Sequence, residues 1–170
     1  MADYYTPTVI QQTIPEADMT PLERLLLSHI FEAERDGEGW YFFSDSAPAD
    51  MIAIECAALS TALAASELGV DTTANAFVER CLASASAGQP HDAHLDLDFC
   101  DESWQSILQD IVRRSSTLQY VSVVSSFTCS RMRPDGFGGA ALVISADAII
   151  GKSTNDLLEE FIAQVAPSAR

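Results

Sequence analysis

The order of strand-like and helix-like segments constrains the fold of this chain more than any other feature. Residues 40–43 (WYFF) are aromatic, and the apolar residues 51–54 (MIAI) follow after a turn as the expected hairpin partner. Residues 118–129 and 140–145 form a second such pair. Strands that follow each other without a helix between them usually pair antiparallel. We therefore predict an α+β fold, with an antiparallel or mixed sheet of about five strands and helices packed mainly on one face.

Amphipathic spacing of apolar residues predicts the helices. The clearest start is Thr20, which can cap a helix that has Pro21 at its first position, while Glu23 completes a capping box. We expect this helix to end near residues 35–39, where two glycines interrupt it. A last helix is expected after Ser153. Its core-facing residues are predicted to be Leu157, Leu158, Phe161, Ile162 and Val165.

The chain length indicates one domain spanning residues 1–170. A chain of this size buries about 70% of its unfolded surface on folding. Residues 1–19 carry prolines and β-branched residues and are predicted to form an extended N-terminal arm. Residues 40–43 can serve either as core or as an interface, so the sequence is compatible with a homodimer.

The charge is distributed unevenly along the chain. Residues 1–112 carry 20 acidic and 3 basic side chains, whereas residues 113–170 carry 5 acidic and 6 basic ones. The net charge of −16 disfavours direct binding to nucleic acid or to acidic membranes and favours a basic protein partner. A surface of this kind also has a simpler interpretation, which is that it keeps the protein soluble.

The N-terminus has neither the basic nor the apolar region of a signal peptide, and no apolar run is long enough to span a membrane. Four cysteines, Cys56, Cys81, Cys100 and Cys129, have no short spacing between them. We expect them to be reduced thiols packed as small hydrophobic residues, and we expect a cytoplasmic protein without a cofactor.

The loop at residues 131–139 (RMRPDGFGG) is one candidate binding site. Arginine side chains bind carboxylate or phosphate in a bidentate manner, and glycines let backbone N–H groups approach an anion. The predicted ligand-binding residues are Arg131, Arg133, Gly136, Gly138 and Lys152. The alternative is an ordinary hairpin loop, in which the arginines pair with nearby acids and Pro134-Asp135-Gly136 forms the turn.

A second candidate is a metal site within residues 91–102, which hold two histidines, five carboxylates and a thiol. Imidazole and carboxylate groups together suit zinc or another divalent ion. The candidate ligands are His91, His94, Asp96 and Asp98. Because residues 95–99 alternate apolar and polar, the alternative is the solvated face of a strand.

The segment Gly151-Lys152-Ser153-Thr154 has the last four residues of a phosphate-binding loop. The first glycine of that motif would fall at Ala146, and Asp147 would lie within the phosphate loop. The alternative is a helix cap in which Ser153 and Asp156 form a capping box. The sequence favours the cap.

Residues 18–27 (DMTPLERLLL) and residues 127–139 (FTCSRMRPDGFGG) resemble a family of small acidic bacterial proteins associated with plasmids and other mobile elements. The family has no assigned activity, so the resemblance assigns no functional residue. It implies an accessory role in a bacterial cytoplasm.

The leading hypothesis is a non-enzymatic accessory protein that acts by protein–protein contact through the acidic surface of residues 1–112. Its partner would be a basic protein, such as a nucleic-acid-binding protein that it masks. The alternative is a domain, with or without enzymatic activity, that binds a small ligand or an anion at residues 131–139.

Overall fold

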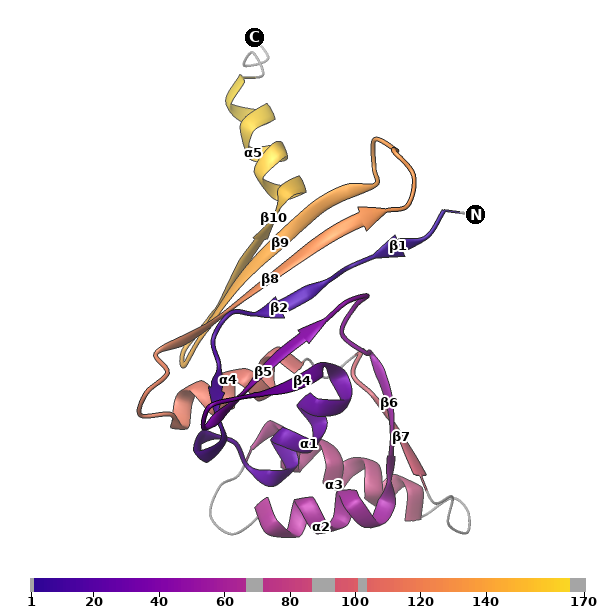
Figure 1. Cartoon of the computed structure of the whole chain (residues 1–170), viewed down its shortest axis with the longest axis vertical. Coiled ribbons are helices and arrows are strands. Elements are labelled where there is room, and N and C mark those ends of the chain that lie inside the picture. Colours follow the sequence, from indigo (N-terminus) through magenta and orange to yellow (C-terminus); the bar gives the residue numbers. More distant parts are fainter. Residues whose placement is uncertain (1, 67–71, 87–93, 101–103, 166–170) are drawn as a thin grey trace.

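A computed structural model describes residues 2–66, 72–86, 94–100 and 104–165 of the chain. Helices α1 to α4 gather at one end of the molecule, and a long antiparallel sheet runs away from them (Figure 1). The helices are α1 (Pro21–Ile30), α2 (Cys56–Ser66), α3 (Thr73–Ser86), α4 (Trp104–Arg114) and α5 (Thr154–Val165), with a short 3-10 helix, η1, at Glu16–Asp18. The predicted α+β class is confirmed.

Ten strands are present in the described part of the chain, and their pairings there are all antiparallel. In the main sheet the order is β10-β9-β8-β2-β5-β3, β1 also pairs with β8, and β4 also pairs with β5. Strands β6 and β7 form a separate two-stranded sheet. The strands are β1 (Tyr4–Tyr5), β2 (Thr8–Ile10), β3 (Ile14–Pro15), β4 (Glu32–Asp36), β5 (Gly39–Ser44), β6 (Met51–Glu55), β7 (His94–Asp98), β8 (Tyr120–Cys129), β9 (Phe137–Ser145) and β10 (Ile149–Ser153).

The main sheet has eight strands rather than about five, because three segments contribute strands that the sequence pattern did not indicate. The N-terminal arm supplies β1, β2 and β3, and residues 149–153 supply β10. Helix α1 ends at Ile30, earlier than predicted, and residues 32–36 form β4. A tight turn with Gly37 at a φ of 58° joins β4 to β5, and that left-handed conformation favours glycine.

The predicted pairing of residues 40–43 with residues 51–54 is wrong. Strand β5 already pairs with β4 on one side and with β2 and β3 on the other. Strand β6 instead pairs with β7, which places Ile52 opposite Leu97 and Ile54 opposite Leu95. Ile52, Ile54 and Leu97 are buried. Burial of this apolar face explains the preference for β7.

The start of α1 follows the predicted chemistry. Thr20 Oγ1 accepts a hydrogen bond from the Glu23 N–H at 3.2 Å, and Glu23 Oε2 accepts one from the Thr20 N–H at 2.8 Å. The capping box satisfies backbone N–H groups that lack partners within the first turn of a helix. Leu22, Leu26 and Leu27 are then completely buried.

The two faces of the main sheet differ. On the face toward the helices, alternate residues are buried, including Ile10, Phe42, Val121, Val123 and Ile144. Helix α4 packs against β8 and β9 on this buried face. On the other face, here called the open face, no described helix forms a covering layer, and Tyr41 stacks on Phe43 with 5.4 Å between ring centroids.

The predicted inward orientation of the last helix is wrong. Helix α5 leaves the end of β10 and extends beyond the sheet, away from α1 to α4 (Figure 1). All of its residues are exposed. The amphipathic segment does form a helix, but its apolar side faces solvent in the single chain because α5 follows an edge strand at the far end of the sheet.

Candidate functional site

A groove of about 640 Å³ lies between α1 and α2. Helix α2 contributes small side chains spaced along one side of the helix, so that the two helices leave an open apolar channel between them. Leu25 and Trp40 supply its larger apolar surfaces. The lining residues from α2 are Ala57, Ala58, Thr61, Ala62 and Ala65.

Trp40 is held at one end of the groove by two arginines. The guanidinium carbon of Arg35 lies 5.3 Å from the ring centroid, and that of Arg24 lies 5.8 Å away. Glu16 forms ion pairs with both arginines, and the hydrogen bond from Arg35 is the main reason that the pKa of Glu16 is lowered. Cation–π contact and ion pairing together orient the indole ring. This end of the groove is therefore ordered without a ligand.

The groove borders an acidic surface at Glu55. Glu55 lies on the exposed face of the β6–β7 sheet, directly opposite His94. Asp96 and Asp98 lie further along that exposed face. A hydrogen bond from the Cys100 N–H is the main reason that the pKa of Asp98 is lowered, so this carboxylate stays charged. An apolar channel with acidic neighbours suits a segment that carries both apolar and basic side chains.

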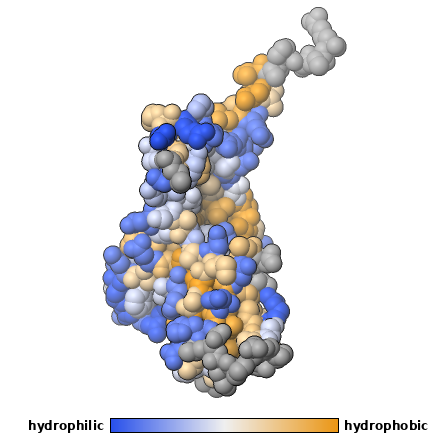
Figure 2. Space-filling model, turned by 90° about the vertical axis from the view of Figure 1, so that its right-hand side faces the viewer, coloured by the Kyte–Doolittle hydropathy of each residue, from blue (hydrophilic) through white to orange (hydrophobic). Residues whose placement is uncertain are grey.

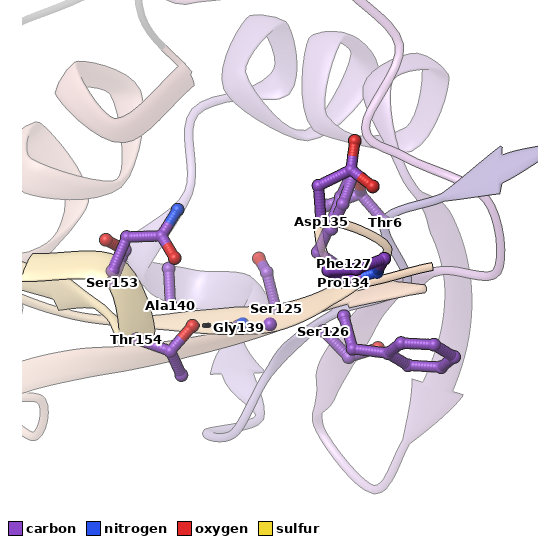
Figure 3. A pocket seen from close by; sticks show the side chains of 13 residues that line it. Thr6, Ser125, Ser126, Phe127, Pro134, Asp135, Gly139, Ala140, Ser153 and Thr154 are labelled. Carbon is purple, nitrogen blue, oxygen red and sulfur yellow. Dashed lines mark hydrogen bonds between the residues drawn. The ribbon is translucent and has the colours of Figure 1, made fainter. Parts of the chain in front are cut away.

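A second cavity, of about 360 Å³, lies at the loop before β9 (Figure 3). Residues of β8, the loop and the β10–α5 junction line it. The Gly139 N–H donates to Thr154 Oγ1 at 3.2 Å. A Cβ at Gly138 would lie 2.8 Å from the same oxygen, so a side chain there would force Thr154 to move. The cavity is thus closed on one side by the start of α5.

The predicted anion-binding residues do not gather around this cavity. Gly138 lines it, whereas Arg131, Arg133, Gly136 and Lys152 are not among the lining residues. Arg133 Nε lies 3.6 Å from Asp135 Oδ1, and Lys152 forms an ion pair with Glu160. The Gly136 N–H donates to the Arg133 carbonyl at 3.0 Å, which closes the predicted turn.

The predicted metal ligands are placed as follows. His94, Asp96 and Asp98 all lie on the exposed face of β7, as expected for a solvated strand face. His91 lies outside the described residues. Within the described parts of the chain, no three histidine, cysteine or acidic side chains are grouped so that they could hold a metal ion.

The helix-cap interpretation of residues 151–154 is confirmed. Ser153 Oγ accepts a hydrogen bond from the Asp156 N–H at 3.1 Å, and Asp156 Oδ2 accepts one from the Ser153 N–H at 2.7 Å. The hydrogen bond from the Ser153 backbone is the main reason that the pKa of Asp156 is lowered.

No disulfide joins the four cysteines; Cys129 is buried, as expected, whereas Cys100 is exposed.

Sequence reasoning missed the α1–α2 groove. The signal was present in α2, where Ala57, Ala58, Ala62 and Ala65 share one helical side. Alanines at this spacing are equally compatible with close helix packing, and only the structure places Thr61 and these alanines beside an open channel.

No protein-family model, curated protein or solved structure matches this chain. The resemblance to plasmid-associated acidic proteins therefore stays a prediction. Among the described residues, no helix is long and apolar enough to cross a membrane.

Proposed function

We propose that this protein is a non-enzymatic accessory protein that works by protein–protein contact, and that the α1–α2 groove holds a segment of a basic partner. The groove itself carries the proposal. Its volume of about 640 Å³ is within the range of about 300–1,000 Å³ that is typical of ligand sites. A partner that binds nucleic acid fits the required chemistry, because its basic surface would be covered by this acidic protein.

The apolar floor supports a bound segment with at least one apolar side chain. Leu25 is half-buried, and Ala57 and Ala65 are exposed, so the channel presents apolar surface to solvent. Burial of that surface by a partner would contribute roughly 25 cal/mol for each Å² removed from water. Trp40, already oriented by Arg24 and Arg35, is the natural contact for an aromatic or aliphatic anchor.

The surrounding charge supports a basic segment. The groove belongs to residues 1–112, which carry 20 acidic and only 3 basic side chains. Two of those three cations, Arg24 and Arg35, share the single carboxylate of Glu16, so this cluster beside Trp40 keeps one net positive charge and the acidic surface offered to a basic segment lies at Glu55. Complementary charge accelerates association and makes binding sensitive to salt.

The test uses peptides selected from a random phage-displayed library on the immobilised protein. We expect the selected peptides to combine lysine or arginine with apolar residues. Their affinity, measured by isothermal titration calorimetry, should fall at least roughly tenfold between about 0.05 M and about 0.5 M NaCl, because exposed charges are screened.

Adjacent alanines of α2 give a matched pair of variants. Ala65 lines the groove, whereas Ala64 is equally exposed on the same helix and does not line it. Ala65→Trp should fill the groove and weaken peptide binding by roughly tenfold or more, while Ala64→Trp should leave it unchanged. Equal binding by both variants, or a selection without basic peptides, would contradict the proposal.

A further inference from the structure

Helix α5 exposes an entire apolar side in the single chain. Its apolar side chains are between 38% and 81% exposed. Figure 2 shows hydrophobic residues along α5, where the described chain ends. The large apolar residues on this side of α5 are Leu157, Leu158, Phe161, Ile162 and Val165.

A helix of this length needs a packing partner. Helix α5 has 12 residues, and isolated helices shorter than about 12–15 residues are only marginally stable in water. The Ser153–Asp156 cap stabilises its start, but most helical stability comes from burial of an apolar face. The described residues outside α5 do not provide that burial, because every residue of α5 is exposed.

The open face of the sheet carries a second apolar area, on strands β8, β9 and β10. The strand register places Ser122, Val143 and Ile150 in one row across β8, β9 and β10. Tyr120 and Val124 lie on the same face of β8, because side chains two residues apart along a strand share a face. The exposed fractions are 49% for Tyr120, 39% for Val124, 45% for Val143 and 69% for Ile150.

The two edge strands of the sheet contrast sharply. Strand β4 carries Glu32, Glu34 and Asp36, and charged side chains of this kind discourage pairing with another chain. Strand β10 instead begins with Ile149 and Ile150. Because Ser145 and Ala148 form the hydrogen-bonded pair at the hairpin, the alternation of the ladder directs the N–H of Ile149 away from β9.

Charge indicates which occupant this region can accept. Two copies of a protein with a net charge of −16 repel each other over most of their surfaces. Residues 120–165, which include α5 and strands β8 to β10, carry 5 acidic and 3 basic side chains, so two copies repel each other far less here. A strongly basic partner would instead be drawn toward residues 1–112.

The exposed apolar area is sufficient for a stable dimer. A standard interface buries roughly 800 Å² on each partner, of which about 57% is apolar. Nine large apolar side chains on α5 and the open face are between 38% and 81% exposed. Together they present on the order of 500 Å² of apolar surface, which matches the apolar part of such an interface.

From these observations we infer that a second copy of this chain covers the apolar surface formed by α5 and the open face of β8, β9 and β10, so that the protein is a symmetric dimer. The apolar side of α5 in each copy lies against the open face of the other. This arrangement buries both surfaces at once and gives α5 its missing packing partner. It does not depend on the proposed function of the α1–α2 groove.

Light scattering after size-exclusion chromatography tests the inference. Wild-type protein should elute with about twice the chain mass of 18.4 kDa. Ile162→Glu places a charge on the apolar side of α5 and should give a monomer. Ala163→Glu adds the same charge at the neighbouring residue, on the opposite side of the helix, and should remain dimeric. Neither residue is buried in the single chain, so neither substitution should prevent folding of the body.

A wild-type monomer at about 0.1 mM would overturn the inference and leave another protein or a lipid surface as the occupant. A dimer that survives Ile162→Glu would overturn it as well, because the interface would lie elsewhere. Binding of the selected peptides to the Ile162→Glu monomer separates the two proposals: the groove can succeed or fail there independently of dimerisation. The dimer should also persist at about 0.5 M NaCl, unlike the groove complex.

Discussion

Arg114→Met provides the sharpest test of how the body of this protein is stabilised. Glu23 is completely buried, and Arg114 NH2 donates to both of its carboxylate oxygens, at 2.8 and 2.6 Å. The two residues lie 91 positions apart in the chain and join α1 to the end of α4. Removal of one partner leaves the other charge buried without compensation, which typically costs about 3–5 kcal/mol.

The structure places the expected loss near the lower end of that range. In the variant Glu23 keeps the hydrogen bond from the Thr20 N–H at 2.8 Å. We therefore expect the free energy of unfolding to fall by about 3 kcal/mol at pH of about 7.5. Urea unfolding followed by fluorescence of Trp40 and Trp104 measures this quantity.

The loss should depend on pH in a direction that the burial of Glu23 determines. Burial raises the pKa of Glu23 above its ordinary value, and the hydrogen bond from Arg114 opposes that rise. Without Arg114 the pKa rises further. When folding raises the pKa of a carboxyl, the protein loses stability as the pH rises above the unfolded-state pKa, and the loss is complete once the pH has passed the folded-state pKa. The difference between variant and wild type should therefore be largest at pH of about 7.5 and smaller at about 5.5.

Two controls distinguish this explanation from a general loss of charge. Arg133→Met removes a cation whose ion pair with Asp135 is exposed on both sides, and it should cost about 1 kcal/mol or less. Glu23→Gln combined with Arg114→Met removes the buried charge together with its partner and should recover much of the loss. A cost below about 1 kcal/mol for Arg114→Met, or a cost that is the same at both pH values, would refute the reasoning.

Two further stability predictions follow from local structure. Thr20→Ala removes the hydroxyl of the α1 capping box and should lower the free energy of unfolding by about 1 kcal/mol in the same urea assay; an unchanged midpoint would mean that the cap contributes nothing. Leu26→Ala creates a cavity at a completely buried position and should lower the free energy of unfolding by about 2–5 kcal/mol. A decrease of less than about 0.5 kcal/mol would contradict the place of Leu26 in the core.

Local chemistry made several elements predictable. The capping boxes at Thr20 and Ser153 were identified from sequence because their donors and acceptors lie within one helical turn. Alternation of apolar and polar residues likewise predicted the exposed face of β7. The pairing between strands was harder to predict from the local sequence pattern. Strand β6 pairs with β7 rather than with β5, because β5 is already paired on both sides by segments that the sequence pattern did not indicate as strands.

The candidate sites show the same division. The arginines of residues 131–139 predicted an anion-binding loop. In the structure Arg133 and Lys152 are each paired with a nearby acid and do not line the cavity beside this loop. The α1–α2 groove was missed because a run of alanines is compatible with close packing or with an open channel. That choice depends on the distance between two helices, which no local pattern specifies.

The sequence by itself determined the α+β class, the helix starts and the amphipathic character of α5, because these depend on side chains within a few residues of one another. Only the tertiary structure decided which surfaces meet: that Glu23 reaches Arg114, that α1 and α2 leave a groove, and that α5 extends into solvent. An amphipathic pattern requires that one side of a helix be covered, but it does not say by what. Among the described residues no element of the same copy covers α5, and the low net charge of that region favours a second copy instead.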